Sequence, residues 1–371
     1  MFEIKEVTNK KELKQFVDLP FELYNQNKFW APPIKSDEIK QLQADTNPSF
    51  KSCTAKFWTC WDGGKCVGRI GAIINHDYNK KVGEKLGRIS RMEFIDDRNV
   101  SKLLFDTAEN WLRDQGMEKV HGPLGFNNLD NQGLLIEGFE YLPSIASVYH
   151  FPYYQTHFDA NGFVKENDWI EFRLTLGETA LAKAKRGAEL VKRRYGFTVK
   201  TFASTNEMQP FAEPVFKMMN GAFGVLPYVT PFDDEMIEYI KQKYFKVLDP
   251  RFVRMIFKED QLVAFIIGMP SLTEAMQKAN GKLFPFGVFH IMKAMKKPEV
   301  IDLLLTGVTP EYHTSGAAVI LFAELQDEMM KHGITQMETT GIFEDNHNVI
   351  SNWKNFTNIQ HKRRRAFIKD L

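Results

Sequence analysis

Cysteine is scarce in this sequence of 371 residues, and the three that occur are Cys53, Cys60 and Cys66. They form no Cys-x-x-Cys pair and have no obvious fourth ligand, so we expect no zinc site and no other bound metal. An odd number of cysteines argues against a disulfide framework. The first residues are typical of a strand rather than of a targeting peptide. Together these features predict reduced thiols and a cytoplasmic location.

Long hydrophobic runs and a charge excess are also missing. No uninterrupted apolar run reaches the roughly 18 residues that a transmembrane helix needs, so we expect none. The net charge is only +1, which gives no overall field for binding nucleic acid. Aromatic residues, in contrast, are plentiful, with 31 Phe, 11 Tyr and 6 Trp. They indicate either a bulky core or a cavity for an apolar ligand.

One stretch combines a strand, a turn and a helix. The apolar run 301–308 predicts a buried strand, the segment 309–316 a turn rich in small residues, and the segment up to Gly333 a helix. Backbone N–H groups and the helix dipole favour an anion, often a phosphate, at such a helix start. The alternative is that the small residues only permit close packing, because short glycine motifs are weak evidence.

The order of predicted elements occurs twice along the chain. Each half shows a strand, helices, a hairpin, a strand–turn–helix, a strand, a helix and a final strand. A repeat of this size implies duplicated domains rather than a solenoid. We therefore predict a first domain at 1–177, a basic linker helix at 178–196 and a second domain at 197–371.

This order resembles the GCN5-related N-acetyltransferase (GNAT) superfamily. The family's turn, Gln/Arg-x-x-Gly-x-Gly/Ala, is matched by His313-Thr314-Ser315-Gly316-Ala317-Ala318. Its second signature, an Asn, a helix and a Tyr, is matched loosely by Asn346 or Asn348 and then Trp353, and in the first half by Tyr153-Tyr154 and by Phe158 before Gly162-Phe163. The resemblance implies an α+β fold of two tandem GNAT-like domains, each a mixed, mostly antiparallel sheet flanked by helices. Several further segments, among them GPLGF and VGRIGA, resemble the bacterial ceramide synthase-like acyltransferases.

The resemblance also implies a ligand and its site. The donor would be acyl-CoA or acetyl-CoA, and backbone N–H groups of the central strand, around Thr306 to Val308, would polarise the thioester carbonyl. The acceptor would be a small-molecule or lipid amine. The implied cofactor-binding residues are Val308, His313, Thr314, Ser315, Gly316, Ala317, Ala318 and Asn346.

Three departures from the family pattern stand out. The first half has Asp96-Asp97 where the glycine turn is expected, and two carboxylates would repel a pyrophosphate. We therefore expect a degenerate first domain on the acceptor side, with cofactor binding kept by the second. His313 replaces the usual Arg or Gln and is not a dependable cation at neutral pH. Trp353 replaces the usual Tyr and cannot protonate a thiolate.

Candidate catalytic residues are Glu338 on the strand after the main helix, His347 just beyond it, and Tyr154 beside the long irregular segment 125–151. Glu344 and Asp345 are alternatives to Glu338, and any single one of these residues, like His347, is more often a surface or capping residue. The predicted activity is N-acylation, with a non-catalytic binding protein as the alternative.

Two further segments mix apolar and basic residues. Residues 281–297 carry Phe and Lys and are a candidate for peripheral contact with the inner face of a membrane. The alternative is a helix packed on the domain with its lysines in water. The closing run 361–365 alternates on a predicted strand, with Lys362 and Arg364 opposite Arg363 and Arg365. It could neutralise the 3′-phosphate of coenzyme A or form a solvated edge.

Overall fold

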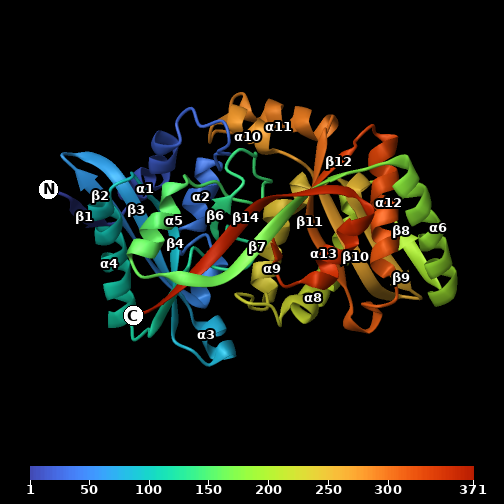
Figure 1. The fold of residues 1–371 in the computed structure, drawn as a ribbon, viewed down its shortest axis with the longest axis horizontal. Coiled ribbons are helices and arrows are strands. Elements are labelled where there is room, and N and C mark those ends of the chain that lie inside the picture. Colours follow the sequence, from blue (N-terminus) through green and yellow to red (C-terminus); the bar gives the residue numbers. More distant parts are fainter. The chain divides into compact units, whose positions relative to one another are not determined.

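A computed structural model describes residues 1–371 apart from the side chain of Lys246. Contacts within the chain define two compact units. Unit 1 comprises residues 1–170, 273–290 and 361–371, and unit 2 comprises residues 171–272 and 291–360. Each unit is a mixed, mostly antiparallel sheet with flanking helices, which confirms the predicted fold class (Figure 1).

Unit 1 has the sheet order β1-β2-β3-β4-β5-β14-β7, with β6 paired to β14. Strands β4 and β5 are parallel, and the other pairs that the structure gives in this unit are antiparallel. The strands are β1 (Glu3–Glu6), β2 (Cys53–Asp62), β3 (Lys65–Asn75), β4 (Leu86–Phe94), β5 (Lys119–Gly122), β6 (Leu134–Glu137), the first part of β7 (Val164–Thr175) and most of β14 (Thr357–Asp370). The helices are α1 (Lys10–Leu23), α2 (Lys35–Gln41), α3 (His76–Val82), α4 (Arg98–Asp114), α5 (Tyr153–Ala160), α10 (Thr273–Ala279) and the start of α11 (Gly287–Lys296).

Helix α4 closes the core of unit 1. Its apolar residues recur at helical spacing, so that Val100, Leu104, Ala108 and Leu112 are fully buried against the sheet. Gly87 on β4 permits this close approach, because an added Cβ would lie 2.4 Å from the Leu112 side chain. Packing of this helix therefore depends on a missing side chain in the strand beneath it.

Unit 2 has the sheet order β7-β12-β11-β10-β9-β8, with β13 paired to β7. Strands β11 and β12 are parallel. The strands are the rest of β7, β8 (Phe197–Lys200), β9 (Val253–Lys258), β10 (Gln261–Pro270), β11 (Val300–Val308), β12 (Gln336–Thr339) and β13 (Ile342–Phe343). The helices are α6 (Glu178–Tyr195), α7 (Thr205–Met208), α8 (Ala212–Phe223), α9 (Asp234–Tyr244), the rest of α11, α12 (Ala317–Lys331) and α13 (His347–Ile350).

The observed division differs from the predicted domains in four places, the first being that residues 171–177 belong to unit 2. Residues 273–290 and 361–371 join unit 1, although the prediction placed both in the second domain. The predicted linker helix is α6, which packs along α12 within unit 2. Ala188 of α6 is buried, and Lys192 pairs with Glu324 of α12 at 2.7 Å. Because α6 has a partner along its length, it acts as a structural helix of unit 2 and not as a connector.

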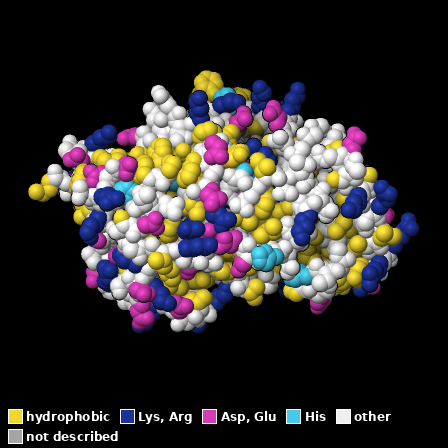
Figure 2. Space-filling model, viewed as in Figure 1, with side chains coloured by type: hydrophobic (Ala, Val, Ile, Leu, Met, Phe, Trp, Pro, Cys, Tyr) yellow, Lys and Arg dark blue, Asp and Glu magenta, His cyan; other side chains and the backbone are white. Residues whose placement is uncertain are grey.

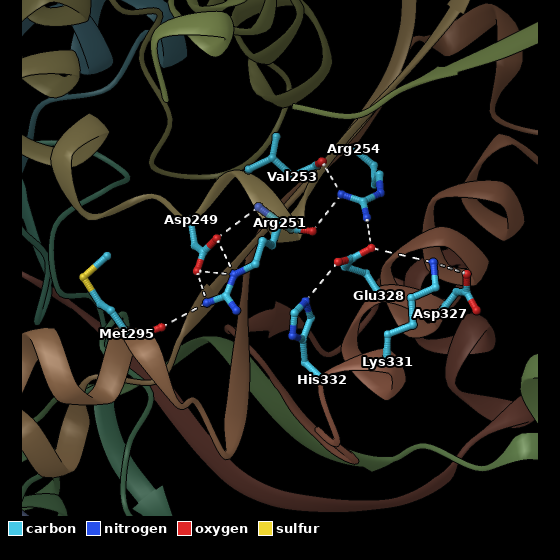
Figure 3. A network of polar contacts seen from close by, with 9 residues as sticks. All are labelled: Asp249, Arg251, Val253, Arg254, Met295, Asp327, Glu328, Lys331 and His332. Carbon is cyan, nitrogen blue, oxygen red and sulfur yellow. Dashed lines mark hydrogen bonds and ion pairs between the residues drawn. The ribbon is translucent and has the colours of Figure 1, made fainter. Parts of the chain in front are cut away.

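Strand β9 is tied to the end of α12 by a polar network (Figure 3). Arg254 on β9 is 4% exposed, and its guanidinium donates to the carbonyls of Arg251 and Val253 at 2.7 and 2.9 Å. It also pairs with Glu328 at 3.1 Å, and Glu328 contacts His332 one turn later. The network fixes the end of α12 that lies opposite the glycine turn.

Among the described residues, no helix has the length and apolar character needed to cross a bilayer. The same residues contain no cluster of three or more His, Cys, Asp or Glu arranged to hold a metal ion.

We predict that Arg254→Met lowers the free energy of unfolding by about 2 to 3 kcal/mol, because Glu328 and two carbonyls then lose a buried donor. Urea unfolding followed by circular dichroism measures this change. Lys331→Met is the matched control, because Lys331 contacts the same network from an exposed position and should cost no more than about 0.5 kcal/mol. Equal losses in the two variants would contradict a structural role for the buried pair.

Candidate functional site

The predicted glycine turn lies where β11 leads into α12. Gly316 has a φ of 88° and is the residue before the helix. An added Cβ there would lie 3.0 Å from Cγ2 of Val191 on α6. Both the left-handed backbone and the neighbouring helix therefore require glycine at this position. Close packing against α6 therefore explains part of the need for small residues in this turn. The same turn also begins a helix whose first N–H groups lack helical partners.

Side chains of the turn mostly stabilise the turn itself. The Ser315 hydroxyl donates to the Tyr312 carbonyl at 2.7 Å and accepts from the Ala317 N–H at 3.1 Å. The His313 ring donates from Nε2 to the Val308 carbonyl at 2.9 Å. The turn thus brings together the predicted residues from Val308 to Ala318, with His313 and Thr314 exposed. Any anion would be held by backbone groups and not by the imidazole.

Asn346 is the one predicted cofactor residue that the structure places elsewhere. Its side-chain oxygen accepts from the Val349 N–H at 3.2 Å and caps the short helix α13. Capping explains why an Asn stands at this position. Its predicted part in cofactor binding stays a prediction.

Strand β11 parts from its parallel neighbour just before this turn. Pairing with β12 runs only from Val300 to Leu303, and Leu304 is then left unpaired in the ladder with β10. Such a bulge bends a strand and re-aims its side chains. Beyond it, β11 stays paired with β10, while β12 has ended at Thr339.

The parted segment of β11 contains an unsatisfied polar atom. The Thr306 hydroxyl is buried, and it has no hydrogen-bond partner among the described residues. Buried hydroxyls are nearly always bonded, but the Ser90 hydroxyl on β4 of unit 1 is also buried without a partner among the described residues. The Thr306 hydroxyl alone therefore does not identify a ligand.

Three aromatic rings contact one another beside the glycine turn, and a cation lies over each of the two outer rings. Tyr312 in the turn packs on Phe197, which stacks on Tyr195. Nζ of Lys258 lies 5.7 Å from the centre of the Tyr312 ring, and Cζ of Arg194 lies 5.4 Å from the centre of the Tyr195 ring. Within the described part of the chain, neither cation forms an ion pair with a carboxylate. The sequence analysis did not identify these two cations as neighbours of the turn, because it interpreted the basic residues of α6 only as part of a linker helix.

The basic residues of the closing run 361–365 have partners within unit 1. Arg363 and Arg365 both pair with the buried carboxylate of Asp168 in unit 1, at 2.9 and 2.8 Å. Lys362 donates to the carbonyls of Gly138 and Tyr141 on the opposite face. The predicted alternation of this strand is confirmed, but these contacts give the run a structural role. The Asp168 carboxylate is shared by Arg363, Arg365 and Lys165, and the suggestion that the run binds the 3′-phosphate stays a prediction.

The candidate catalytic residues of unit 2 occupy different environments. Glu338 on β12 is buried, and its carboxylate accepts at 2.8 Å from Nε of Arg173 on β7. His347 is exposed at the first residue of α13. Trp353 is buried against Phe322, and its indole N–H has no partner among the described residues. Their catalytic roles stay predictions.

The corresponding helix start in unit 1 is filled by the chain itself. The Asp97 carboxylate accepts from the Asn99 N–H at 2.7 Å and caps α4. Asp96 contacts His157 at 2.9 Å, and that ring contacts Ser101 at 2.7 Å. The N-terminus of α4 therefore already has its anion.

Strand β4 of unit 1 has the same bulge as β11, at Arg91 and Met92, where Arg91 adopts a φ of 48°. The strand pairs with β5 only from Leu86 to Arg88. Beyond the bulge, however, the strand edge is occupied. The Phe94 N–H donates to the Tyr154 hydroxyl at 3.0 Å, and the Phe94 carbonyl accepts from Tyr153 at 2.5 Å.

A buried carboxylate completes this arrangement. Glu93 accepts from the hydroxyls of Tyr24 and Tyr154 at 2.6 and 2.8 Å. Burial raises the pKa of Glu93, while the Arg69 guanidinium opposes that rise. Burial also holds the pKa of Tyr154 well above its ordinary value, so the phenol stays protonated and acts as a hydrogen-bond donor. This is the setting of Tyr154, whose predicted catalytic role stays a prediction.

The comparison with known proteins gives no matching family model. Protein YghO of Escherichia coli (strain K12) is 28% identical over 351 residues, covering 92% of this chain and 89% of the relative. The bacterial ceramide synthase of Caulobacter vibrioides (strain NA1000 / CB15N) is 25% identical over 373 residues, covering 97% of this chain and 95% of the relative.

Solved structures share the fold over the whole chain. A tandem GNAT protein from the clavulanic acid biosynthesis pathway superposes with a TM-score of 0.59 at 14% identity, covering 100% of this chain and 98% of that one. A GCN5-related N-acetyltransferase from Sphaerobacter thermophilus gives 0.53 at 11% identity, covering 100% and 95%. The predicted tandem GNAT fold and the similarity to the bacterial ceramide synthase-like group are confirmed.

The buried histidines of unit 1 predict acid sensitivity. Burial lowers the pKa of His150 from 6.5 to about 3, and its Nδ1 accepts from the Leu135 N–H at 3.2 Å. The unfolded chain therefore binds a proton near pH 6.5 that the folded chain refuses until about pH 3. This stability is complete above pH 6.5 and is lost as the pH falls, by up to about 1.4 kcal/mol per pH unit.

His150→Asn keeps an acceptor for Leu135 but removes the titrating ring. We expect its unfolding free energy between pH 7 and pH 5, measured in urea, to fall less steeply than that of the wild type. His76→Asn changes an exposed ring and should keep the wild-type slope. Identical slopes for all three proteins would contradict the assignment.

Proposed function

We propose that this chain is an acyl-CoA-dependent N-acyltransferase, which moves an acyl group from a thioester to an amine. The fold and the curated relative support an acyltransferase in general. One asymmetry carries the finer proposal. In unit 2 the parted strand leads into a glycine turn, whereas in unit 1 a tyrosine hydroxyl bonds the parted strand at Phe94 and the Asp97 carboxylate caps the helix start.

The residues of unit 2 divide the binding of the donor among them. The backbone N–H groups of Gly316 and Ala318 face the pyrophosphate, since the Ala317 N–H donates to the Ser315 hydroxyl. Lys258 and Arg194 supply positive charge for the nucleotide phosphates. The β11 backbone beyond Leu304 polarises the thioester carbonyl, which is the oxyanion-type stabilisation that acyl transfer needs. The bound donor itself supplies an electrophilic thioester carbon.

Transfer forms a C–N bond and breaks a C–S bond. The attacking amine must be neutral, so a base has to take one of its protons. Glu338 and His347 are the candidates in unit 2, with Glu344 and Asp345 as alternatives. The departing thiolate finds no acid in Trp353, because an indole N–H donates a hydrogen bond but not a proton. Solvent is then the source of that proton.

The acceptor that we propose is a long-chain amine of the sphingoid type. The relative from Caulobacter vibrioides is named a bacterial ceramide synthase, and the similarity spans nearly the full length of both chains. The aromatic content of the sequence favours an apolar ligand over a sugar amine.

A second candidate is a non-catalytic acyl-CoA-binding protein on the same scaffold. The ion pair of Glu338 with Arg173 favours it, because a carboxylate held by a guanidinium is occupied. Donor binding without turnover would support this second candidate and contradict the first.

A charge placed in either helix start tests where the donor binds. We predict that Thr314→Glu weakens palmitoyl-CoA and acetyl-CoA binding about tenfold or more, measured by calorimetry, since a like charge near a pyrophosphate costs on the order of 1 to 2 kcal/mol. Asn99→Glu places the same charge at the start of α4 and should leave the affinity unchanged. Gly316 is avoided, because any side chain there strains the backbone.

Thr306→Val checks the same binding site without a charge. It removes a buried hydroxyl that has no partner, so stability should stay constant or rise, while donor affinity should fall a few-fold. A wild type without affinity for either thioester would contradict the proposed function. Equal weakening by Thr314→Glu and Asn99→Glu would contradict the assignment of the donor to unit 2.

An acceptor screen tests the reaction and its substrate class. Purified protein with palmitoyl-CoA should release free thiol, detected with a thiol reagent, when a long-chain amino alcohol is added. Short amino alcohols, amino acids and amino sugars at the same concentration should react at least about tenfold more slowly, as expected when apolar contacts supply the binding energy. Turnover confined to small polar amines would contradict the lipid acceptor while leaving the acyltransferase assignment intact.

A further inference from the structure

Three aromatic rings project into solvent ahead of and within α11. Phe284, Phe286 and Phe289 are 76%, 71% and 65% exposed. We name these three residues the Phe patch. Soluble proteins expose single apolar side chains routinely, but a cluster of large ones marks a contact surface. Figure 2 shows hydrophobic side chains next to Lys or Arg side chains, with some Asp or Glu side chains nearby, in the region where Figure 1 places α10 and α11.

The base of the Phe patch is firmly anchored within unit 1. Thr273 donates to the Pro143 carbonyl at 2.6 Å, and Gln277 donates to the carbonyls of Lys28 and Trp30. The Gly281 carbonyl accepts from the Lys35 N–H at 3.0 Å. The rings therefore extend from a fixed support, and their exposure does not follow from a loose chain end.

Two lysines share the helix face of Phe289, the one ring of the Phe patch that lies within α11. On α11, Phe289, Lys293 and Lys296 stand at positions i, i+4 and i+7, which share one face of a helix. All three side chains are exposed. The sequence has no Asp or Glu from residue 275 to residue 298. Its basic residues in that range are Lys278, Lys282, Lys293, Lys296 and Lys297.

The positive charge of this surface favours a negatively charged partner. A second copy of the chain would bring lysines against lysines, which repel one another. An anionic phospholipid bilayer accepts both components, because aromatic rings enter the interface while lysine stems lie along it and place their charges at the headgroups. We propose that the Phe patch, together with Lys293 and Lys296, docks this protein on an anionic bilayer surface. This inference is independent of the acyltransferase proposal.

Vesicle flotation of the full chain tests the proposal. We expect the wild type to float with vesicles of phosphatidylcholine and phosphatidylglycerol, and to stay in solution with phosphatidylcholine alone. Phe284→Ser/Phe286→Ser/Phe289→Ser should lower the bound fraction about tenfold or more, because three interfacial rings are lost. Lys293→Glu/Lys296→Glu should lower it to a similar extent, and added salt should weaken the wild type.

Matched controls separate this surface from general stickiness. Val225→Ser removes another exposed apolar residue, and Lys10→Glu/Lys14→Glu makes the same charge change on α1. Both should float as the wild type does. All substituted residues are exposed, so thermal unfolding should be unchanged and will identify a misfolded variant.

Three results would overturn the proposal. The first is a wild type that stays in solution with anionic vesicles. The second is equal flotation of the Phe patch variant and its control. The third is sedimentation showing a dimer that the Phe patch variant converts to a monomer, because the surface would then be an interface between copies of this chain. Loss of flotation confined to the two patch variants would support it.

Discussion

In each unit the strand that leads into the main helix is bulged, and the bulge parts it from its parallel neighbour. On β11 the bulge falls at Leu304, and on β4 at Arg91 and Met92. Parallel pairing ends just before it in both cases, so the backbone beyond has only one bonded edge. Unpaired backbone groups inside a protein must find partners. Much of what distinguishes the two units follows from how each one meets that requirement.

Unit 1 meets it with its own side chains. The tyrosine hydroxyls that bond to Phe94 stand where a ligand's amides could lie, and Asp97 satisfies the helix start. Unit 2 fills these places with other groups: the Ser315 hydroxyl accepts from the Ala317 N–H, the Thr340 hydroxyl donates to the Leu304 carbonyl at 3.4 Å, and the buried Thr306 hydroxyl has no partner among the described residues. The two units thus share one arrangement of strands and helices, and they differ in the side chains that lie at the helix start and at the parted strand edge.

The sequence was informative wherever a local pattern determined the outcome. Apolar periodicity located β11 and α12. Sequence patterns failed where distant segments meet. Lys258 and Arg194 are separated by 64 positions and are connected only through the contacting rings of Tyr312, Phe197 and Tyr195. The terminal strand was assigned to the second domain, because nothing local shows that residues 361–371 pair with unit 1. Glu93 carried no motif at all, and only the fold reveals its two tyrosine partners.

The polar residues around Glu93 follow from the unpaired backbone groups at one edge of β4. The Phe94 N–H and carbonyl need partners, and Tyr153 and Tyr154 supply hydroxyls. A buried hydroxyl that accepts from an N–H must itself donate, and the Glu93 carboxylate accepts from Tyr154 and also from Tyr24. A buried carboxylate needs a counter-charge, and Arg69 lies close enough to oppose the rise in the pKa of Glu93. Each polar group is present because the previous one could not be left unsatisfied. An apolar filling would have left Phe94 unbonded, so the polarity of this core follows from the geometry of β4 and does not by itself indicate catalysis.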